Sequence, residues 1–131
     1  MKARILIIED NEQNLYMETF LLEKQGYEVV GARDGREGIE VAMRLKPALI
    51  VLDIQLPVMD GHEVARRLKE QPETRAIPIV AVTSYAMPSD REKILDNGCE
   101  GYMEKPINPN TFVSELERYL PTSPPPDSAE S

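Results

Sequence analysis

The segment 48–61, which reads ALIVLDIQLPVMDG, constrains the fold of this chain more than any other part of it. Its first residues form a continuous apolar run, which is typical of a strand buried on both faces of a parallel sheet. The run ends at Asp53, and Pro57 prevents the strand from continuing. Asp60 and Glu63 then have the spacing of a helix N-terminus. The segment therefore predicts a carboxylate at the carboxyl end of a buried strand, the edge where open α/β sheets bind ligands.

Strand-like and helix-like segments alternate five times along the chain. Right-handed crossovers and the need to cover both faces predict an α/β fold, a doubly wound five-stranded parallel sheet of flavodoxin-like order 2-1-3-4-5. Apolar residues surround much of the first helix, so we expect it to pack on more than one side. The expected strands are 4–9, 27–31, 48–52, 77–83 and 101–104, and the expected helices are 11–25, 34–46, 61–70, 88–97 and one that begins at Asn108-Pro109.

Composition restricts the possible functions of the chain. Its 131 residues suit one domain, which we expect over 1–120, followed by a disordered Pro/Ser-rich tail over 121–131. A net charge of −8 argues against direct nucleic-acid binding and against an anionic membrane surface. The single Cys99 excludes an internal disulfide, and no Cys/His cluster suggests zinc. With neither a signal peptide nor a long apolar run, we expect a cytoplasmic protein that does not insert into membranes.

Three carboxylates are expected to meet at one edge of this sheet. Glu9 and Asp10 follow the first strand and Asp53 ends the third, and these strands are neighbours in the predicted order. Like charges this close raise one another's pKa and stay ionised together only beside a counter-charge. An all-oxygen ligand set suits Mg²⁺ better than zinc. We therefore predict a magnesium site.

Two further polar residues end strands at the same edge, Thr83 after the fourth and Lys105 after the fifth. Each of the five residues alone also has an ordinary explanation, as a strand end, a helix-start charge or a solvated lysine. Their joint position is what indicates a site. A carboxylate beside a metal ion, a hydroxyl and an ammonium group is suited to accept a phosphoryl group, with Asp53 as the in-line nucleophile.

The same segments resemble the receiver domains of two-component response regulators over 1–120, through IIEDN (7–11), LDIQLPVMDG (52–61), VAVTSYA (80–86) and GYMEKPI (101–107). The resemblance implies that Asp53 is the phosphoacceptor and that Tyr102 acts with Thr83 as a switch. It also implies a cis Lys105-Pro106 peptide and phosphoryl contacts from Thr83 and Lys105. The implied magnesium ligands are Glu9, Asp10, Asp53 and the backbone carbonyl of Gln55.

The resemblance implies a signalling switch and not an enzyme, with at most self-phosphorylation and self-dephosphorylation. Its phosphodonor would be a sensor histidine kinase or a histidine phosphotransfer protein. Its downstream protein target would bind the surface formed by 89–97, 100–105 and 111–119. No output domain is expected after residue 120, so the chain is similar to single-domain regulators of the division-control and chemotaxis types. The residue at position 55 varies among receivers and is expected to tune dephosphorylation, which leaves the lifetime of the phosphorylated state open.

Other functions fit the sequence less well. A receiver used as an unphosphorylated docking module is the main alternative. A flavodoxin-like FMN protein is more remote, because Glu9, Asp10 and Glu12 would repel the FMN phosphate. A magnesium-dependent phosphatase usually has a second acid two residues after its nucleophile, where this chain has Gln55.

Overall fold

The computed structural model describes residues 2–120; residue 1 and residues 121–131, which include the expected tail, lie outside the described part. Five parallel strands form one sheet in the order β2-β1-β3-β4-β5. This architecture confirms the predicted fold class and strand order. The elements are β1 (Arg4–Ile8), α1 (Glu12–Lys24), β2 (Glu28–Ala32), α2 (Gly35–Leu45), β3 (Leu49–Asp53), α3 (Gly61–Glu70), β4 (Ile79–Thr83), α4 (Pro88–Asp96), β5 (Gly101–Glu104) and α5 (Phe112–Glu117).

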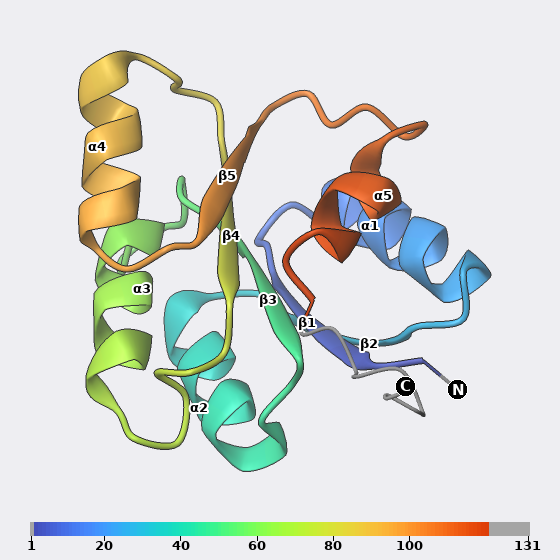
Figure 1. Cartoon of the computed structure of the whole chain (residues 1–131), viewed down its shortest axis with the longest axis horizontal. Helices are drawn as coiled ribbons and strands as arrows, with labels where there is room; N and C mark the ends of the chain where they lie inside the picture. Colours follow the sequence, from blue (N-terminus) through green and yellow to red (C-terminus); the bar gives the residue numbers. More distant parts are fainter. Residues whose placement is uncertain (1, 121–131) are drawn as a thin grey trace, which may run out of the picture.

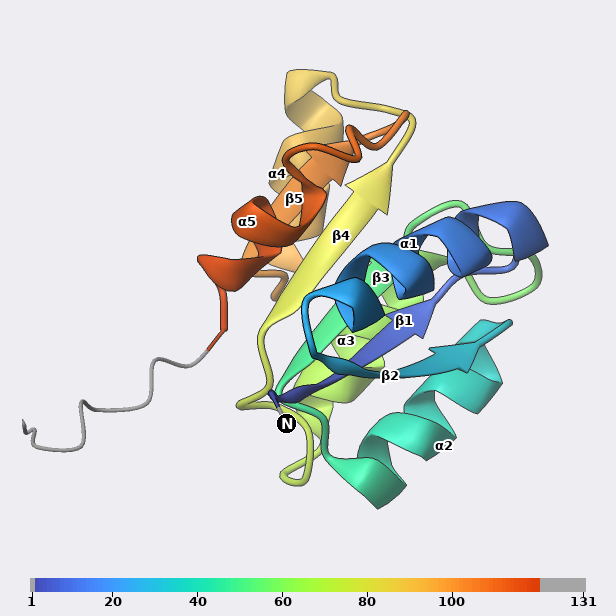
Figure 2. The same cartoon turned by 90° about the vertical axis from the view of Figure 1, so that its right-hand side faces the viewer.

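The sheet is the middle of three layers. Helices α1 and α5 cover one face, and α2, α3 and α4 cover the other (Figures 1 and 2). Successive strand residues point to opposite faces, so β1 contributes to both cores. Leu6 and Ile8 belong to the core under α2 and α3. Ile5 and Ile7 belong to the core under α1 and α5. Burial on both faces explains why the central strands are continuous apolar runs.

Local sequence signals position α3 as predicted. The Asp60 side chain accepts a hydrogen bond from the Glu63 backbone N–H at 3.0 Å, which satisfies a free donor of the first turn. Val64, Ala65 and Leu68 form the expected narrow stripe and are fully buried. The helix begins immediately after the loop that follows Asp53, so its cap helps to fix that loop.

The prediction that the first helix packs on more than one side is wrong. Tyr16 and Phe20 are 74% and 53% exposed, whereas Glu18 and Leu22 are the buried residues of α1. The helix lies on one face of the sheet, so only one stripe of its surface reaches the core (Figure 2). Two aromatic side chains that the sequence suggested for packing are therefore exposed to solvent.

The prediction that the last helix begins at Asn108-Pro109 is also wrong. The Asn108 side chain accepts a hydrogen bond from the Asn110 backbone N–H at 2.9 Å, and the Asn108 carbonyl accepts one from the Thr111 N–H at 3.1 Å. Asn108 thus stabilises a turn, and α5 begins at Phe112. Asn and Thr form helix interiors poorly because their side chains compete for backbone hydrogen bonds, which favours this turn.

No helix within residues 2–120 combines the length and the hydropathy that a membrane crossing requires.

A close backbone approach at Gly61 holds the loop after β3 against the strand. A Cβ atom at Gly61 would lie 2.5 Å from the Cα of Ile54 and 2.6 Å from the carbonyl oxygen of Asp53, and these backbone atoms have little room to move. We expect Gly61→Ala to lower the free energy of unfolding by about 1–3 kcal/mol through overpacking, as measured by urea denaturation.

Gly31→Ala is the matched control. A Cβ at Gly31 would meet only side-chain atoms of Leu15, at 3.2 Å, and this side chain can adjust. We expect a smaller loss for Gly31→Ala. Equal losses in the two variants would contradict the role assigned to the backbone approach at Gly61.

Candidate functional site

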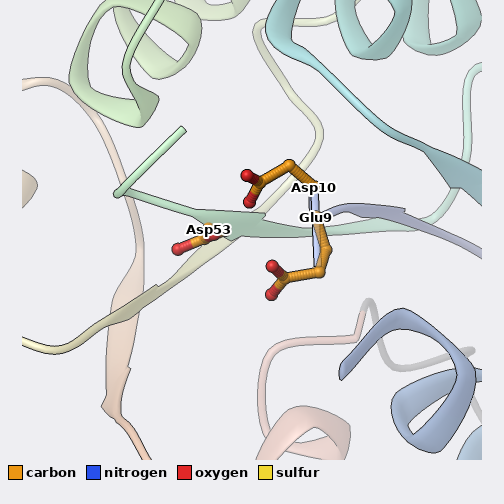
Figure 3. A group of neighbouring side chains, drawn as sticks. All are labelled: Glu9, Asp10 and Asp53. Carbon is orange, nitrogen blue, oxygen red and sulfur yellow. The ribbon is translucent and has the colours of Figure 1, made fainter. Parts of the chain in front are cut away.

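The ends of β1 and β3 bring three carboxylates together. Ile8 pairs with Leu52, so the next residues, Glu9 and Asp53, meet at the same edge of the sheet. One carboxylate oxygen from each of Glu9, Asp10 and Asp53 lies within 4.8 Å of the other two, and Figure 3 shows the three side chains together. Glu9 and Asp53 are only 1% and 2% exposed, whereas Asp10 is accessible to solvent. The structure therefore groups the three acids predicted as magnesium ligands.

Lys105, which directly follows β5, supplies a positive charge to this group. Its Nζ lies 3.1 Å from Asp53 Oδ1 and 3.7 Å from Glu9 Oε1. Burial alone would lower the pKa of Lys105, but the hydrogen bond and charge attraction to Asp53, together with Glu9, raise it. Lys105 is therefore a cation placed directly beside the proposed phosphoacceptor.

The single ammonium group does not balance the acidic cluster. Burial raises the pKa of Glu9 to about 7, and repulsion from Asp53 adds to this effect. A hydrogen bond from the Asn11 N–H and the charge of Lys105 act in the opposite direction. Glu9 thus gives up its proton less readily than a solvated glutamate does. A hard divalent cation would compensate the same charge, so this donor set fits magnesium well.

The loops after β3 and β4 complete the edge. The backbone N–H of Gln55 donates to Asp53 Oδ1 at 3.1 Å, which fixes the carboxylate. Thr83 ends β4 one position beyond Val82, which pairs with Asp53. The Thr83 side chain is 1% exposed and accepts a hydrogen bond from the Gln55 amide at 3.0 Å. The structure thus places Gln55 and Lys105 in contact with Asp53, and Thr83 in contact with Gln55.

Tyr102 lies on β5, partly buried against the core that contains Leu6 and Ile8, on the face of the sheet covered by α2, α3 and α4. The Arg91 guanidinium of α4 lies 5.6 Å from the centre of its ring, within the range of a cation–π contact. The Lys105-Pro106 peptide is cis, as the resemblance implied. Tyr102 is therefore placed between the sheet edge and α4.

Sequence reasoning missed Glu18, a fourth acid that faces this region from α1. Its side chain is 1% exposed, and its Oε2 atom has no hydrogen-bond partner. Burial raises the pKa of Glu18 to about 8, and the charge of Glu9 adds to the shift. One signal could have identified it, because Glu18 is spaced three residues after Leu15 and four before Leu22, on the helix side that faces the core.

Comparison with known proteins identifies the family. The family model of the response regulator receiver domain matches residues 5–117. The chain belongs to the response regulator receiver family. It is a receiver domain of the phosphoaccepting, two-component type, a signalling module and not a conventional enzyme.

Individual receivers resemble it over nearly their whole length. The chain is 42% identical over 120 residues to the polar-differentiation response regulator DivK of Brucella anthropi, covering 92% of this chain and 98% of that protein. The Vibrio cholerae chemotaxis protein CheY4 is 31% identical with a TM-score of 0.87, covering 92% of this chain and 100% of that one.

A third receiver is described with a metal in place. The receiver domain of the sensor histidine kinase PA1611 of Pseudomonas aeruginosa, solved with a magnesium ion coordinated in its active-site cleft, is 33% identical with a TM-score of 0.83. The match covers 91% of this chain and 98% of that one.

Glu18 generates a pH-dependent prediction. The unfolded chain releases this proton near pH 4.5, whereas the folded chain retains it up to a pKa of about 8, so Glu18 lowers stability as pH rises through this window. Glutamine cannot ionise. In magnesium-free buffer, we expect the stability gain of Glu18→Gln over wild type to grow by about 1–3 kcal/mol from about pH 5 to about pH 8.

Chemical denaturation at several pH values measures this gain. Glu23→Gln, an exposed position on the same helix, is the matched control. If the gain of Glu18→Gln does not change with pH, the buried carboxyl is not ionising as described.

Proposed function

We propose that Asp53 accepts a phosphoryl group in this receiver, with Mg²⁺ as cofactor, and that phosphorylation switches a protein-docking surface. The observation that carries the proposal is the 3.1 Å contact between Lys105 Nζ and Asp53 Oδ1 within a cluster of three carboxylates at the ends of β1 and β3. The chemistry of this cluster, and not the fold alone, supports phosphoryl transfer.

The nucleophile in this proposal is a carboxylate oxygen of Asp53. It forms a new bond to phosphorus while the bond between phosphorus and the donor atom breaks, and the electron pair leaves with the donor. Asp53 is held by the Gln55 N–H and by Lys105, which keep the carboxylate in place for attack. Lys105 then neutralises part of the charge on the phosphoryl oxygens.

Glu9, Asp10, Asp53 and the Gln55 backbone carbonyl would hold the magnesium ion. Bound there, the ion would supply positive charge to the phosphoryl oxygens. The raised pKa of Glu9, which burial causes first and the charge of Asp53 increases, supports this assignment, because a divalent cation would favour the ionised form of Glu9. Metal binding and proton release from Glu9 are therefore expected to be coupled.

Thr83 and Tyr102 would carry the switch. Thr83 would donate its hydroxyl hydrogen to a phosphoryl oxygen, which draws the loop after β4 toward Asp53, and Tyr102 would move inward beside α4. The downstream target would bind the surface of 89–97, 100–105 and 111–119. Leu95, an exposed apolar side chain on α4, supports this choice of surface, and Tyr85 and Met87, which are exposed just before α4, extend it.

A sensor histidine kinase or a histidine phosphotransfer protein would be the phosphodonor, which makes the cytoplasm the expected compartment. The chain's own chemistry would be limited to self-phosphorylation from small donors and self-dephosphorylation. We also propose that residues 1–120 form the receiver unit, since the family match spans 5–117. The net charge of −8 supports a protein partner over direct DNA binding.

Intact-mass spectrometry tests the proposal directly. Incubation with magnesium and acetyl phosphate should add one phosphoryl group to the wild-type chain. The added mass should be absent without magnesium and absent in Asp53→Asn, because the amide is not nucleophilic. Asp60→Asn is the matched control, since asparagine also caps helices and Asp60 lies outside the carboxylate cluster.

If Asp53→Asn is phosphorylated as readily as wild type, the acceptor assignment is wrong. If neither acetyl phosphate nor a phosphorylated histidine phosphotransfer protein modifies the wild type, the alternative of an unphosphorylated docking module gains support.

A further inference from the structure

The hydroxyl of Thr83 is fully engaged within the chain. It donates its one hydrogen to the Tyr85 carbonyl at 3.1 Å and accepts hydrogen bonds from the Tyr85 N–H and the Gln55 amide, both at 3.0 Å. A hydroxyl offers one donor and two acceptor positions, so no capacity remains. Thr83 can donate to a phosphoryl oxygen only after it gives up the Tyr85 carbonyl.

The side chain of Gln55 joins two loops at this point. Its Nε2 donates to Thr83 Oγ1, and its Oε1 accepts from the Ser84 backbone N–H at 2.9 Å. The loop after β3 (54–60) is thereby linked to the loop after β4 (84–87). The amide donates from its nitrogen and accepts at its oxygen, whereas a carboxylate lacks the donor and an apolar side chain lacks both.

These contacts oppose the movement that the switch requires. A phosphoryl group on Asp53 would draw Thr83 toward it, whereas Gln55 holds Thr83 and Ser84 in their present positions. The side chain of Gln55 is only partly buried, and Ser84 is exposed, so both bonds can break without disturbing the core. The contacts are therefore suited to a reversible constraint.

We propose that Gln55 is a positioning residue whose side-chain amide latches the loop after β4 in the unphosphorylated arrangement by holding Thr83 and Ser84. The effect of this latch on the switch rests on the proposed function, but the latch itself is a property of the unphosphorylated chain. Removing the amide frees the loop and favours the state in which Thr83 turns toward Asp53. The backbone carbonyl of Gln55, the proposed metal ligand, is retained in any substitution.

Amide hydrogen exchange in the full, unphosphorylated chain tests the latch without any phosphoryl group. Gln55→Met has a similar length and no hydrogen-bonding amide, so the Ser84 N–H loses its acceptor and should exchange about fivefold faster, the effect of losing one ordinary hydrogen bond. The Tyr85 N–H should also exchange faster, because Gln55 no longer holds its acceptor, Thr83 Oγ1. Gln55→Glu keeps the acceptor but loses the donor, so Tyr85 should exchange faster while Ser84 stays close to wild type. Unchanged exchange at Tyr85 in both variants would overturn the proposal.

Val58→Ala is the matched control, because Val58 lies in the same loop and its side chain is fully exposed. This variant should leave exchange at Ser84 and Tyr85 unchanged. An equal acceleration in Val58→Ala would show that general loosening of the loop, and not the Gln55 amide, is responsible, and would overturn the proposal.

Binding of beryllofluoride, a stable mimic of an aspartyl phosphate, measures the consequence for the switch. In saturating magnesium, Gln55→Met should bind it about fivefold more tightly than wild type, because the latch no longer has to be broken. A purely structural role would weaken binding instead, so unchanged or weaker binding contradicts the proposal. If the wild type binds no beryllofluoride, the proposed function fails, and the exchange result still decides whether the latch exists.

Discussion

The charge balance between Lys105 and the buried acids at the carboxyl ends of β1 and β3 underlies the whole site. Parallel strands place Glu9 and Asp53 side by side in an apolar environment, where two carboxylates repel each other and are poorly solvated. Lys105 contacts both acids but carries one positive charge. The cluster therefore carries more negative than positive charge, and burial, together with the charge of Asp53, raises the pKa of Glu9. Such an excess of negative charge suits the binding of a cation, which supports the proposed phosphoryl transfer at Asp53.

The rest of the structure holds that edge by apolar packing, whereas the loop after β4 is joined to it by polar contacts. The two apolar cores on either side of the sheet fix β1, β3 and β4, so the positions of the acids follow from the strand register. The loop after β4 is held by a few polar contacts, among them the hydrogen bonds that Gln55 makes with Thr83 and Ser84. Each such hydrogen bond contributes little net free energy and can break and re-form locally, unlike the packing of the core. In the proposed function, this division would let a change of charge at Asp53 move a surface without unfolding the domain.

The fold and the site acids could be predicted from sequence because their signals are local. The Asp60 cap and the apolar stripe after it determine α3, and strand order alone brings Asp53 to the site edge. The remaining features depend on tertiary packing. The exposure of Tyr16 depends on how much of α1 the sheet can cover. The burial of Glu18 depends on segments distant in sequence, since Glu18 lines one pocket with Ser84 and Lys105. The contact of Gln55 with Thr83 joins side chains 28 residues apart, which no periodicity reveals.

A crystal structure of the chain with magnesium and beryllofluoride tests the central claim most directly. The account predicts the ion among the oxygen atoms of Glu9, Asp10 and Asp53, with the beryllofluoride on the Asp53 carboxylate and in contact with Lys105. A beryllofluoride group attached to another residue, or a magnesium ion bound away from this cluster, would contradict the claim that the edge of β1 and β3 is the phosphoacceptor site.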